Sequence, residues 1–273
     1  MTKRLKAVEL FMALGLVAGT AACTGSNTTE PEVGTAPDAT ELAEGGEGGE
    51  GGEGGEGGEG GEGGEGGEGG EGGEGGEGGA YSAGEQANAD FQDKLSGPEL
   101  LSALQEGGHV IYFRHAQTER DYADQADPNM RLDDCETQRK LNEVGIKQSE
   151  DIGTAFEEKG IPVGDIITSE YCRAWQTAEL AFGTYEKNAN LNFLPFEEYT
   201  DAQVEEMKAN VTPLLTEVPA DGTNTVIVGH DDIFEAATGI YPDPQGLAYV
   251  LTPDGNGDFT LQANVLPEEW AEL

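Results

Sequence analysis

The 273-residue sequence predicts an α/β fold, a three-layer sandwich with a central, mostly parallel mixed sheet. Between residues 96 and 265, short apolar runs of strand length alternate with longer stretches in which apolar residues recur at helical spacing. The last two extended runs, 246–252 and 259–265, instead flank the turn sequence Asp254-Gly255-Asn256-Gly257, which is typical of an antiparallel hairpin. Strands this apolar are expected to be covered by helices on both faces of the sheet.

The expected elements follow one another with ends that glycine and proline mark. Besides the hairpin, strands are expected at 109–113, 165–168, 191–194 and 225–228. Helices are expected at 96–104, 141–159, 171–182, 202–215 and 232–237. Gly107-Gly108 ends the first helix, Gly160-Ile161-Pro162 ends the second and Gly183 ends the third. Ser169 is expected to cap the third helix.

The N-terminus resembles an export signal. Residues 1–22 form the expected signal peptide, in which three basic residues precede the apolar run 10–18, and this run is too short to span a bilayer. Small residues lead into Cys23, as in a bacterial lipoprotein box. The resemblance implies cleavage before Cys23 and a lipid on that residue, so that the protein would be exported and anchored to the cell envelope. The alternative is a simple cleaved signal without a lipid.

Residues 23–89 are expected to form a disordered acidic tether. Within them, residues 44–79 repeat Glu-Gly-Gly twelve times. A segment with so few apolar side chains cannot offset the entropy lost on ordering. A Gly-rich coil of this length reaches roughly 30–36 Å, and would hold the domain formed by residues 90–273 away from a membrane. A cation-binding or adhesive tail is the alternative.

The domain is strongly acidic, with 36 acidic and 11 basic residues between positions 90 and 273. This balance excludes nucleic-acid binding through a basic face, because neutralising phosphates takes lysine and arginine. Concentrated salt screens surface charges within a few ångströms. The acidic excess therefore supports the hypothesis that the protein is adapted to a high-salt environment.

Three polar clusters follow strands of the expected sheet. Arg114-His115 follows the first strand, Arg173 lies shortly after the second, and His230-Asp231 follows the fourth. Because the carboxyl ends of parallel strands meet at one edge of a sheet, we expect these side chains to lie close together. Two histidines and two arginines at one edge, in a chain this poor in basic residues, predict an anion-binding site.

Four motifs, in this order, resemble the histidine phosphatase superfamily, whose fold is called phosphoglycerate mutase-like. Residues 113–118, Phe-Arg-His-Ala-Gln-Thr, resemble the signature Arg-His-Gly/Ala-x-Thr. Residues 141–148 resemble the helix that follows it, residues 168–178 the second-arginine motif, and residues 226–230 the second-histidine strand. The resemblance covers roughly residues 98–265 and is most similar to secreted bacterial members.

The resemblance implies a phosphatase that acts on phosphomonoesters. His115, neutral at its attacking nitrogen, would displace the alcohol and become a phosphohistidine. Arg114 and Arg173 would hold the phosphate oxygens with forked donors, and His230 would stabilise the transferring phosphoryl group. No metal or other cofactor is expected, because the two arginines supply the positive charge that a divalent ion would bring.

The donor of the leaving-group proton stays open. Asp231 is one candidate, as in the His-Asp pair of the superfamily's acid phosphatases, although an aspartate here could equally cap a helix. Glu197 and Glu198 are the other candidates, near the place of a glutamate in the mutase-type branch, or they form an exposed loop pair. Thr118 and Arg139 are expected to contact substrate, with pairing to a surface acid as the alternative for Arg139.

Cys135 and Cys172 remain as an even pair if Cys23 carries the lipid. In an exported domain such a pair suggests a disulfide, and two free buried thiols are the alternative. The sequence therefore predicts an exported, metal-independent phosphomonoesterase for a phosphorylated small molecule or envelope component. The alternative function is a non-catalytic module that binds a phosphorylated or envelope ligand on the same fold.

Overall fold

The computed structural model describes residues 81–120, 122–196 and 198–273. The predictions about the signal peptide, Cys23, the Glu-Gly-Gly repeat and Glu197 lie outside the described residues. None of the helices in the described ranges is both long enough and apolar enough to cross a lipid bilayer.

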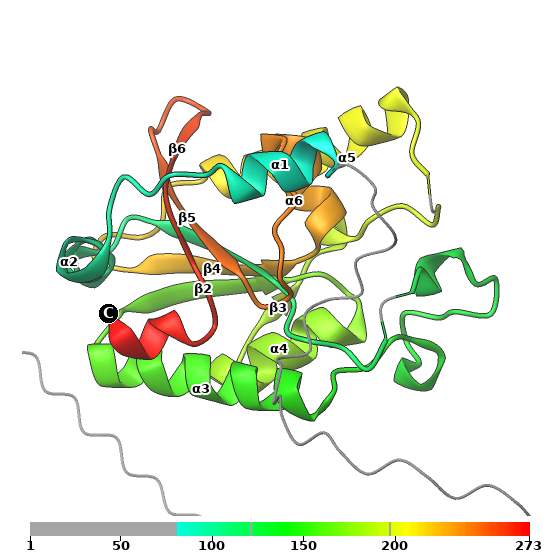
Figure 1. Ribbon diagram of the computed structural model, residues 1–273, viewed down its shortest axis with the longest axis horizontal. Coiled ribbons are helices and arrows are strands. Elements are labelled where there is room, and N and C mark those ends of the chain that lie inside the picture. Colours follow the sequence, from blue (N-terminus) through cyan, green and yellow to red (C-terminus); the bar gives the residue numbers. More distant parts are fainter. Residues whose placement is uncertain (1–80, 121, 197) are drawn as a thin grey trace, which may run out of the picture. The chain divides into compact units, whose positions relative to one another are not determined.

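A six-stranded mixed sheet lies at the centre of the domain (Figure 1). Its strands are β1 (Val110–Arg114), β2 (Val163–Thr168), β3 (Glu186–Lys187), β4 (Asn224–Gly229), β5 (Ala248–Pro253) and β6 (Phe259–Val265). They are ordered β3-β2-β4-β1-β5-β6, and the first four pair in parallel. β5 runs antiparallel to β1 and β6, which confirms the expected C-terminal hairpin and the mostly parallel sheet.

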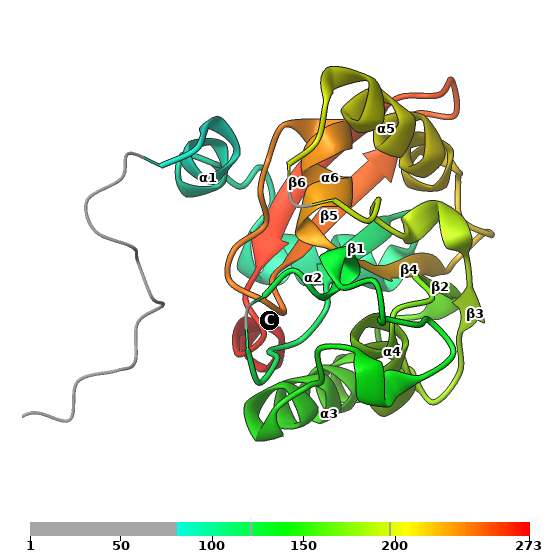
Figure 2. The ribbon, with the colours of Figure 1, turned by 90° about the vertical axis from the view of Figure 1, so that its right-hand side faces the viewer.

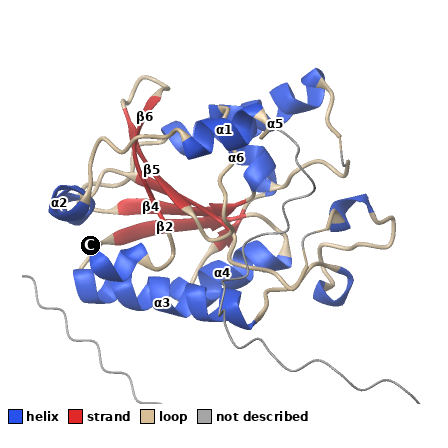
Figure 3. Cartoon of the chain, viewed as in Figure 1, coloured by secondary structure: helices blue, strands red, loops and turns tan. Residues whose placement is uncertain are grey.

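Helices cover both faces of this sheet (Figures 2 and 3). The α-helices are α1 (Ala83–Ala89), α2 (Gly97–Glu106), α3 (Glu143–Lys159), α4 (Cys172–Phe182), α5 (Asp201–Thr216) and α6 (Asp231–Thr238). Short 3-10 helices are η1 (Asp124–Ala126), η2 (Cys135–Thr137), η3 (Ala189–Leu191) and η4 (Glu269–Glu272). Figures 1 and 2 place α3 and α4 on one side of the sheet and α5 and α6 on the other. The predicted three-layer architecture is therefore confirmed.

Alternate residues of the central strand β1 serve two separate cores. Ile111 and Phe113 belong to the core under α3 and α4, whereas Val110 and Tyr112 belong to the core under α5 and α6. Successive side chains of a strand point to opposite faces, so a strand covered on both faces is apolar throughout. This explains why the first strand appears in the sequence as an unbroken apolar run.

The strand expected at 191–194 is wrong. Leu191 ends the 3-10 helix η3, and the edge strand is the short β3, which lies before it. Leu191 and Phe193 are buried in the core under α5 and α6. The apolar pattern therefore indicated burial of this loop rather than strand pairing.

Helix α1 shortens the predicted tether, because it belongs to the folded domain. The Ser82 hydroxyl accepts from the backbone N–H of Glu85, and the Glu85 carboxylate accepts from that of Ser82. Ala87 packs against the core, and the Asn88 side chain donates to a backbone carbonyl in the loop before β5. The missed signal was this reciprocal Ser-x-x-Glu capping pair.

Candidate active site

The three polar clusters meet at one edge of the sheet. Arg114 pairs with Gly229 at the ends of β1 and β4, and Thr168 pairs with Val228 at the end of β2. The loops that follow these strands therefore begin side by side. The rings of His115 and His230 lie 5.5 Å apart between centroids. The expected convergence of the two histidines is confirmed.

His115 is held with the lone pair of one ring nitrogen facing two guanidinium groups. Its Nδ1 lies 2.8 Å from the backbone oxygen of Ala116. A carbonyl oxygen only accepts, so Nδ1 carries the hydrogen and Nε2 carries the lone pair. Arg173 Nε and Arg139 Nη2 each lie 3.2 Å from this Nε2. Burial and then the charge of Arg173 hold the pKa of His115 well below the ordinary value of 6.5, which keeps the imidazole neutral.

His230 is oriented by a hydroxyl and by its own backbone. Ser169 Oγ lies 2.7 Å from His230 Nε2 and also accepts from the backbone N–H of Tyr171. His230 Nδ1 has no partner among the described residues. Tyr112 Oη donates to the backbone oxygen of His230 and accepts from its N–H. Ser169 therefore positions His230, and the helix-cap prediction for it is wrong, since α4 begins at Cys172.

Asp124 joins the two arginines that touch His115. Its Oδ2 lies 2.9 Å from Arg173 Nη1 and accepts from the backbone N–H of Arg139 at 2.8 Å. Asp124 and Arg173 are both 1 % exposed. Arg139 also donates from Nη1 to the backbone oxygen of Tyr122. The structure thus brings Arg139 to the site, as expected, whereas sequence reasoning missed Asp124, which no motif marks.

The predicted disulfide between Cys135 and Cys172 is present. Cys172 directly precedes Arg173, and Cys135 lies on the segment that carries Asp124 and Arg139. The bond therefore fixes that segment to the start of α4, next to the side chains that contact His115.

The guanidinium of Arg114 binds two carboxylates and a backbone carbonyl. Its Nη2 lies 2.6 Å from Asp231 Oδ2, and its Nη1 lies 2.9 Å from Asp243 Oδ1 and 3.0 Å from the backbone oxygen of Pro242. The guanidinium also stacks over the ring of Tyr241. Arg114 is 1 % exposed, and its charge is one of the influences that lower the pKa of His115.

Asp231 and Asp232 open helix α6 with opposite electrostatic surroundings. Asp231 accepts from Arg114, from the Tyr241 hydroxyl at 2.7 Å and from the backbone N–H of Asp232. Burial alone would raise the pKa of Asp231, but Arg114 and the Tyr241 hydroxyl outweigh it and hold that pKa below the ordinary value. Burial and then the negative charge of Asp231 raise the pKa of Asp232 to about 7.

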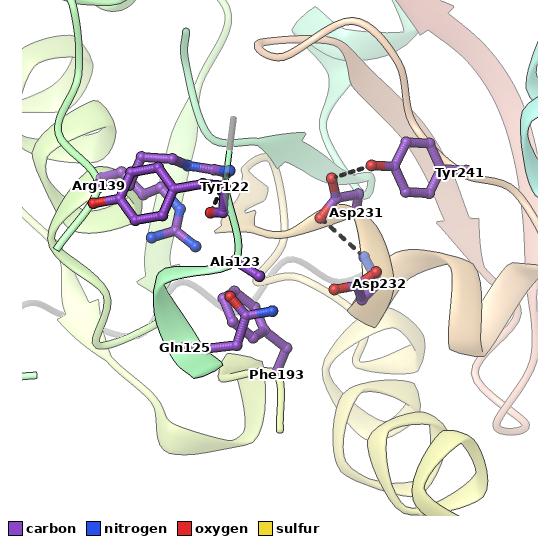
Figure 4. A pocket seen from close by; sticks show the side chains of 9 residues that line it. Tyr122, Ala123, Gln125, Arg139, Phe193, Asp231, Asp232 and Tyr241 are labelled. Atoms are coloured by element: carbon purple, nitrogen blue, oxygen red, sulfur yellow. Dashed lines mark hydrogen bonds between the residues drawn. The ribbon is translucent and has the colours of Figure 1, made fainter. Parts of the chain in front are cut away.

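A pocket of about 250 Å³ lies over these groups (Figure 4). It is lined by Tyr122, Ala123, Gln125, Arg139, Arg173, Phe193, Asp231, Asp232 and Tyr241. Figure 4 shows Arg139 across the pocket from Asp231 and Asp232. His115 and His230 are fully buried and do not line it. Arg173 and Arg139 line the pocket and also contact His115 Nε2, so these two side chains connect the pocket with the buried imidazole.

Thr118 and Glu198 lie away from this pocket. Thr118 Oγ1 donates to the backbone oxygen of Arg120, and its N–H donates to Gln245 Oε1, so this residue fixes the loop after His115. Glu198 is exposed. Neither residue lines the pocket, and their contact with substrate stays a prediction.

Solved structures similar to this chain include the protein histidine phosphatase SixA complexed with tungstate, at 16 % identity and a TM-score of 0.43, covering 59 % of this chain and 98 % of that one. A phosphoserine phosphatase from Entamoeba histolytica has 14 % identity and a TM-score of 0.43, covering 57 % and 95 %. The alpha-ribazole phosphatase from Shigella flexneri has 16 % identity and a TM-score of 0.42, covering 57 % and 95 %.

No curated protein sequence matches the chain. The family model of the histidine phosphatase superfamily (branch 1) matches residues 110–217, which include His115, Arg139 and Arg173. His230 follows the matched residues, at the end of the strand that pairs with β1. Over residues 110–217 the chain is therefore similar to the histidine phosphatase superfamily, branch 1.

Proposed function

We propose that this protein hydrolyses phosphomonoesters through a phosphohistidine on His115. The observation that carries the proposal is the position of the two ring nitrogens of His115 relative to their neighbours. The Ala116 carbonyl holds its Nδ1–H, and its Nε2 lone pair faces two guanidinium groups at 3.2 Å. A phosphoryl group seated between that lone pair and those cations is placed for in-line attack, and its charge is balanced by Arg139 and Arg173.

The reaction proceeds in two transfers. In the first, His115 Nε2 bonds to phosphorus and the alcohol leaves. In the second, water attacks phosphorus and the bond to Nε2 breaks, which releases phosphate. His230, whose ring is oriented by the contact with Ser169, donates to a phosphoryl oxygen. The buried charge of Arg114 adds to the positive potential around His115. The guanidinium groups take the role that a metal ion has in other phosphatases.

The test is phosphate release from an aryl phosphate by the full chain. We expect His115→Ala to lose activity roughly a thousandfold or more, since nothing else supplies the nucleophile. His109→Gln is the matched control, because His109 lies before β1 and bonds Thr252, far along the strand from the site. A chelator should leave the rate unchanged. Tight binding of phosphate without turnover would instead support the non-catalytic binding module.

The substrate we propose is a phosphorylated small molecule or the phosphorylated end of an envelope component. A pocket of about 250 Å³ is smaller than the ~300–1,000 Å³ typical of ligand sites, which favours a compact ester. Comparing kcat/KM for a small alkyl phosphate and for a bulky phosphorylated macromolecule measures this preference. Faster turnover of the bulky substrate would contradict it.

Export and lipid anchoring at Cys23 belong to the same proposal, and the sequence pattern alone supports them. In a bacterial host, the full chain should partition with membranes and incorporate a labelled fatty acid, whereas Cys23→Ala should do neither. Equal membrane partitioning of both proteins, or a soluble unlabelled wild type, would contradict the anchor.

A further inference from the structure

The alcohol that leaves a phosphomonoester needs a proton, and Asp231 is poorly placed to give one. Its carboxylate already accepts from three donors: the Arg114 guanidinium, the Tyr241 hydroxyl and the backbone N–H of Asp232. A carboxylate so occupied, with a guanidinium at 2.6 Å, holds no proton to donate. The acid therefore has to be another group on the pocket.

Asp232 is the other carboxylate among the residues that line the pocket, and it lies across from Arg139 (Figure 4). It is the second residue of α6, two positions after His230, and it lines the same pocket as Arg139 and Arg173. Its side-chain partner is the hydroxyl of Tyr199, at 3.3 Å from Oδ2. No guanidinium forms an ion pair with it among the described residues.

The Tyr199 hydroxyl is a weak partner for Asp232. It lies 3.2 Å from the backbone oxygen of Leu194 and 3.3 Å from Asp232 Oδ2, so the single phenol hydrogen is shared between two long contacts. Asp232 therefore lacks the short, charged contact that holds Asp231 as a carboxylate.

Burial and the charges around Asp232 favour the protonated form of its carboxyl group. Burial is the largest influence on its pKa, followed by the negative charge of Asp231, and both raise it. The groups that face it are Asp231 and Glu235 on α6, which raise the pKa, and the Tyr199 hydroxyl and Arg114 on β1, which lower it. Together these influences leave Asp232 able to hold a proton at neutral pH and to release it to a strong base.

We propose that Asp232, and not Asp231, is the general acid and base of the phosphatase reaction, an inference that rests on the proposed function. As His115 Nε2 bonds to phosphorus, the bond from phosphorus to the ester oxygen breaks and its electron pair leaves with oxygen. The Asp232 carboxyl transfers its proton to that oxygen, so a neutral alcohol departs and Asp232 becomes a carboxylate.

The second half of the cycle restores both groups. The Asp232 carboxylate takes a proton from water as the water oxygen bonds to phosphorus. The bond between phosphorus and Nε2 then breaks, and its electron pair returns to His115. Phosphate leaves, and Asp232 is protonated for the next turnover.

The test uses leaving groups that differ in their need for a proton. With the full chain, Asp232→Asn should lower kcat/KM for an alkyl phosphate about a hundredfold to ten-thousandfold, while an aryl phosphate, whose phenolate leaves unaided, should change by a few-fold at most. Asp232→Glu should restore part of the alkyl activity. The fall in alkyl activity above neutral pH should disappear in Asp232→Asn. Glu205→Gln, an exposed acid on α5, is the control for charge removal.

Several results would overturn the assignment. Equal losses on both substrate classes would indicate a structural role for Asp232. Unchanged alkyl activity, or a selective alkyl loss in Asp231→Asn or Glu198→Gln instead, would place the acid elsewhere. A KM increase confined to amine-bearing esters would make Asp232 a cation-recognition residue.

A second measurement does not depend on turnover. In a carbon-labelled sample, an aspartate carboxyl should titrate near neutral pH by NMR, and this signal should be missing from Asp232→Asn. If every aspartate titrates in the ordinary acidic range, the assignment falls even in an active enzyme. If wild type and Asp232→Asn both release no phosphate from either substrate, the proposed function fails, and the catalytic role of Asp232 fails with it.

Discussion

His115 combines full burial with guanidinium neighbours, and both lower its pKa. The neutral imidazole is the nucleophile, so activity is lost only when pH falls below the lowered pKa of the folded protein. We therefore expect the acid limb of kcat/KM for an aryl phosphate to lie below pH 6.5, the ordinary value. A pH profile measures this directly. An acid limb at or above 6.5 would show that the imidazole is more exposed to solvent than it is here.

Asp124 forms a fully buried ion pair with Arg173. Removing one partner leaves a buried charge uncompensated, so Asp124→Asn should lower the free energy of unfolding by about 3–5 kcal/mol. Asp133→Asn is the matched control, because its ion pair with Arg131 is exposed to solvent and should contribute little to stability. Urea unfolding gives both values. Equal small effects would mean that Asp124 does not hold Arg173 in place.

At the scale of elements, the disulfide between Cys135 and Cys172 fixes the segment that carries Asp124 and Arg139. The bond closes an interval of 37 residues, so its loss should cost about 3–4 kcal/mol of stability. We expect reductant to lower the melting temperature and raise KM, because Arg139 loses its fixed position. The double variant Cys135→Ser/Cys172→Ser should show both changes and no response to reductant. Full activity of the double variant would show that catalysis does not require the disulfide.

Helices and strands could be predicted from the sequence wherever the spacing of apolar residues matches the way the element packs in the core. The central strands were predicted because β1 and β4 are buried on both faces, and the side chains after them could be placed together from topology alone. The strand expected at 191–194 failed, since apolar residues mark burial without specifying pairing partners. The roles of Asp124 and Ser169 could not be predicted, because they depend on the path of loops.

At the scale of the whole molecule, charge dominates. Residues 90–273 hold 36 acidic and 11 basic residues, and the repulsion among the excess negative charges opposes compact folding in dilute buffer. Near 1 M salt the Debye length falls to roughly 3 Å, which removes most of this repulsion while contacts inside the buried site persist. We expect the melting temperature to rise as the sodium chloride concentration is increased from about 0.1 to about 1 M. A flat or falling curve would contradict adaptation to high salt.

The central claim is that His115 carries the phosphoryl group between two transfers. The full chain is mixed with excess aryl phosphate, quenched in alkali during turnover and digested for peptide mass spectrometry. We expect one phosphoryl group on the peptide containing His115, located on that imidazole, and none in His115→Ala. Sustained turnover without a phosphorylated protein, or a phosphoryl group on any other residue, would contradict the mechanism.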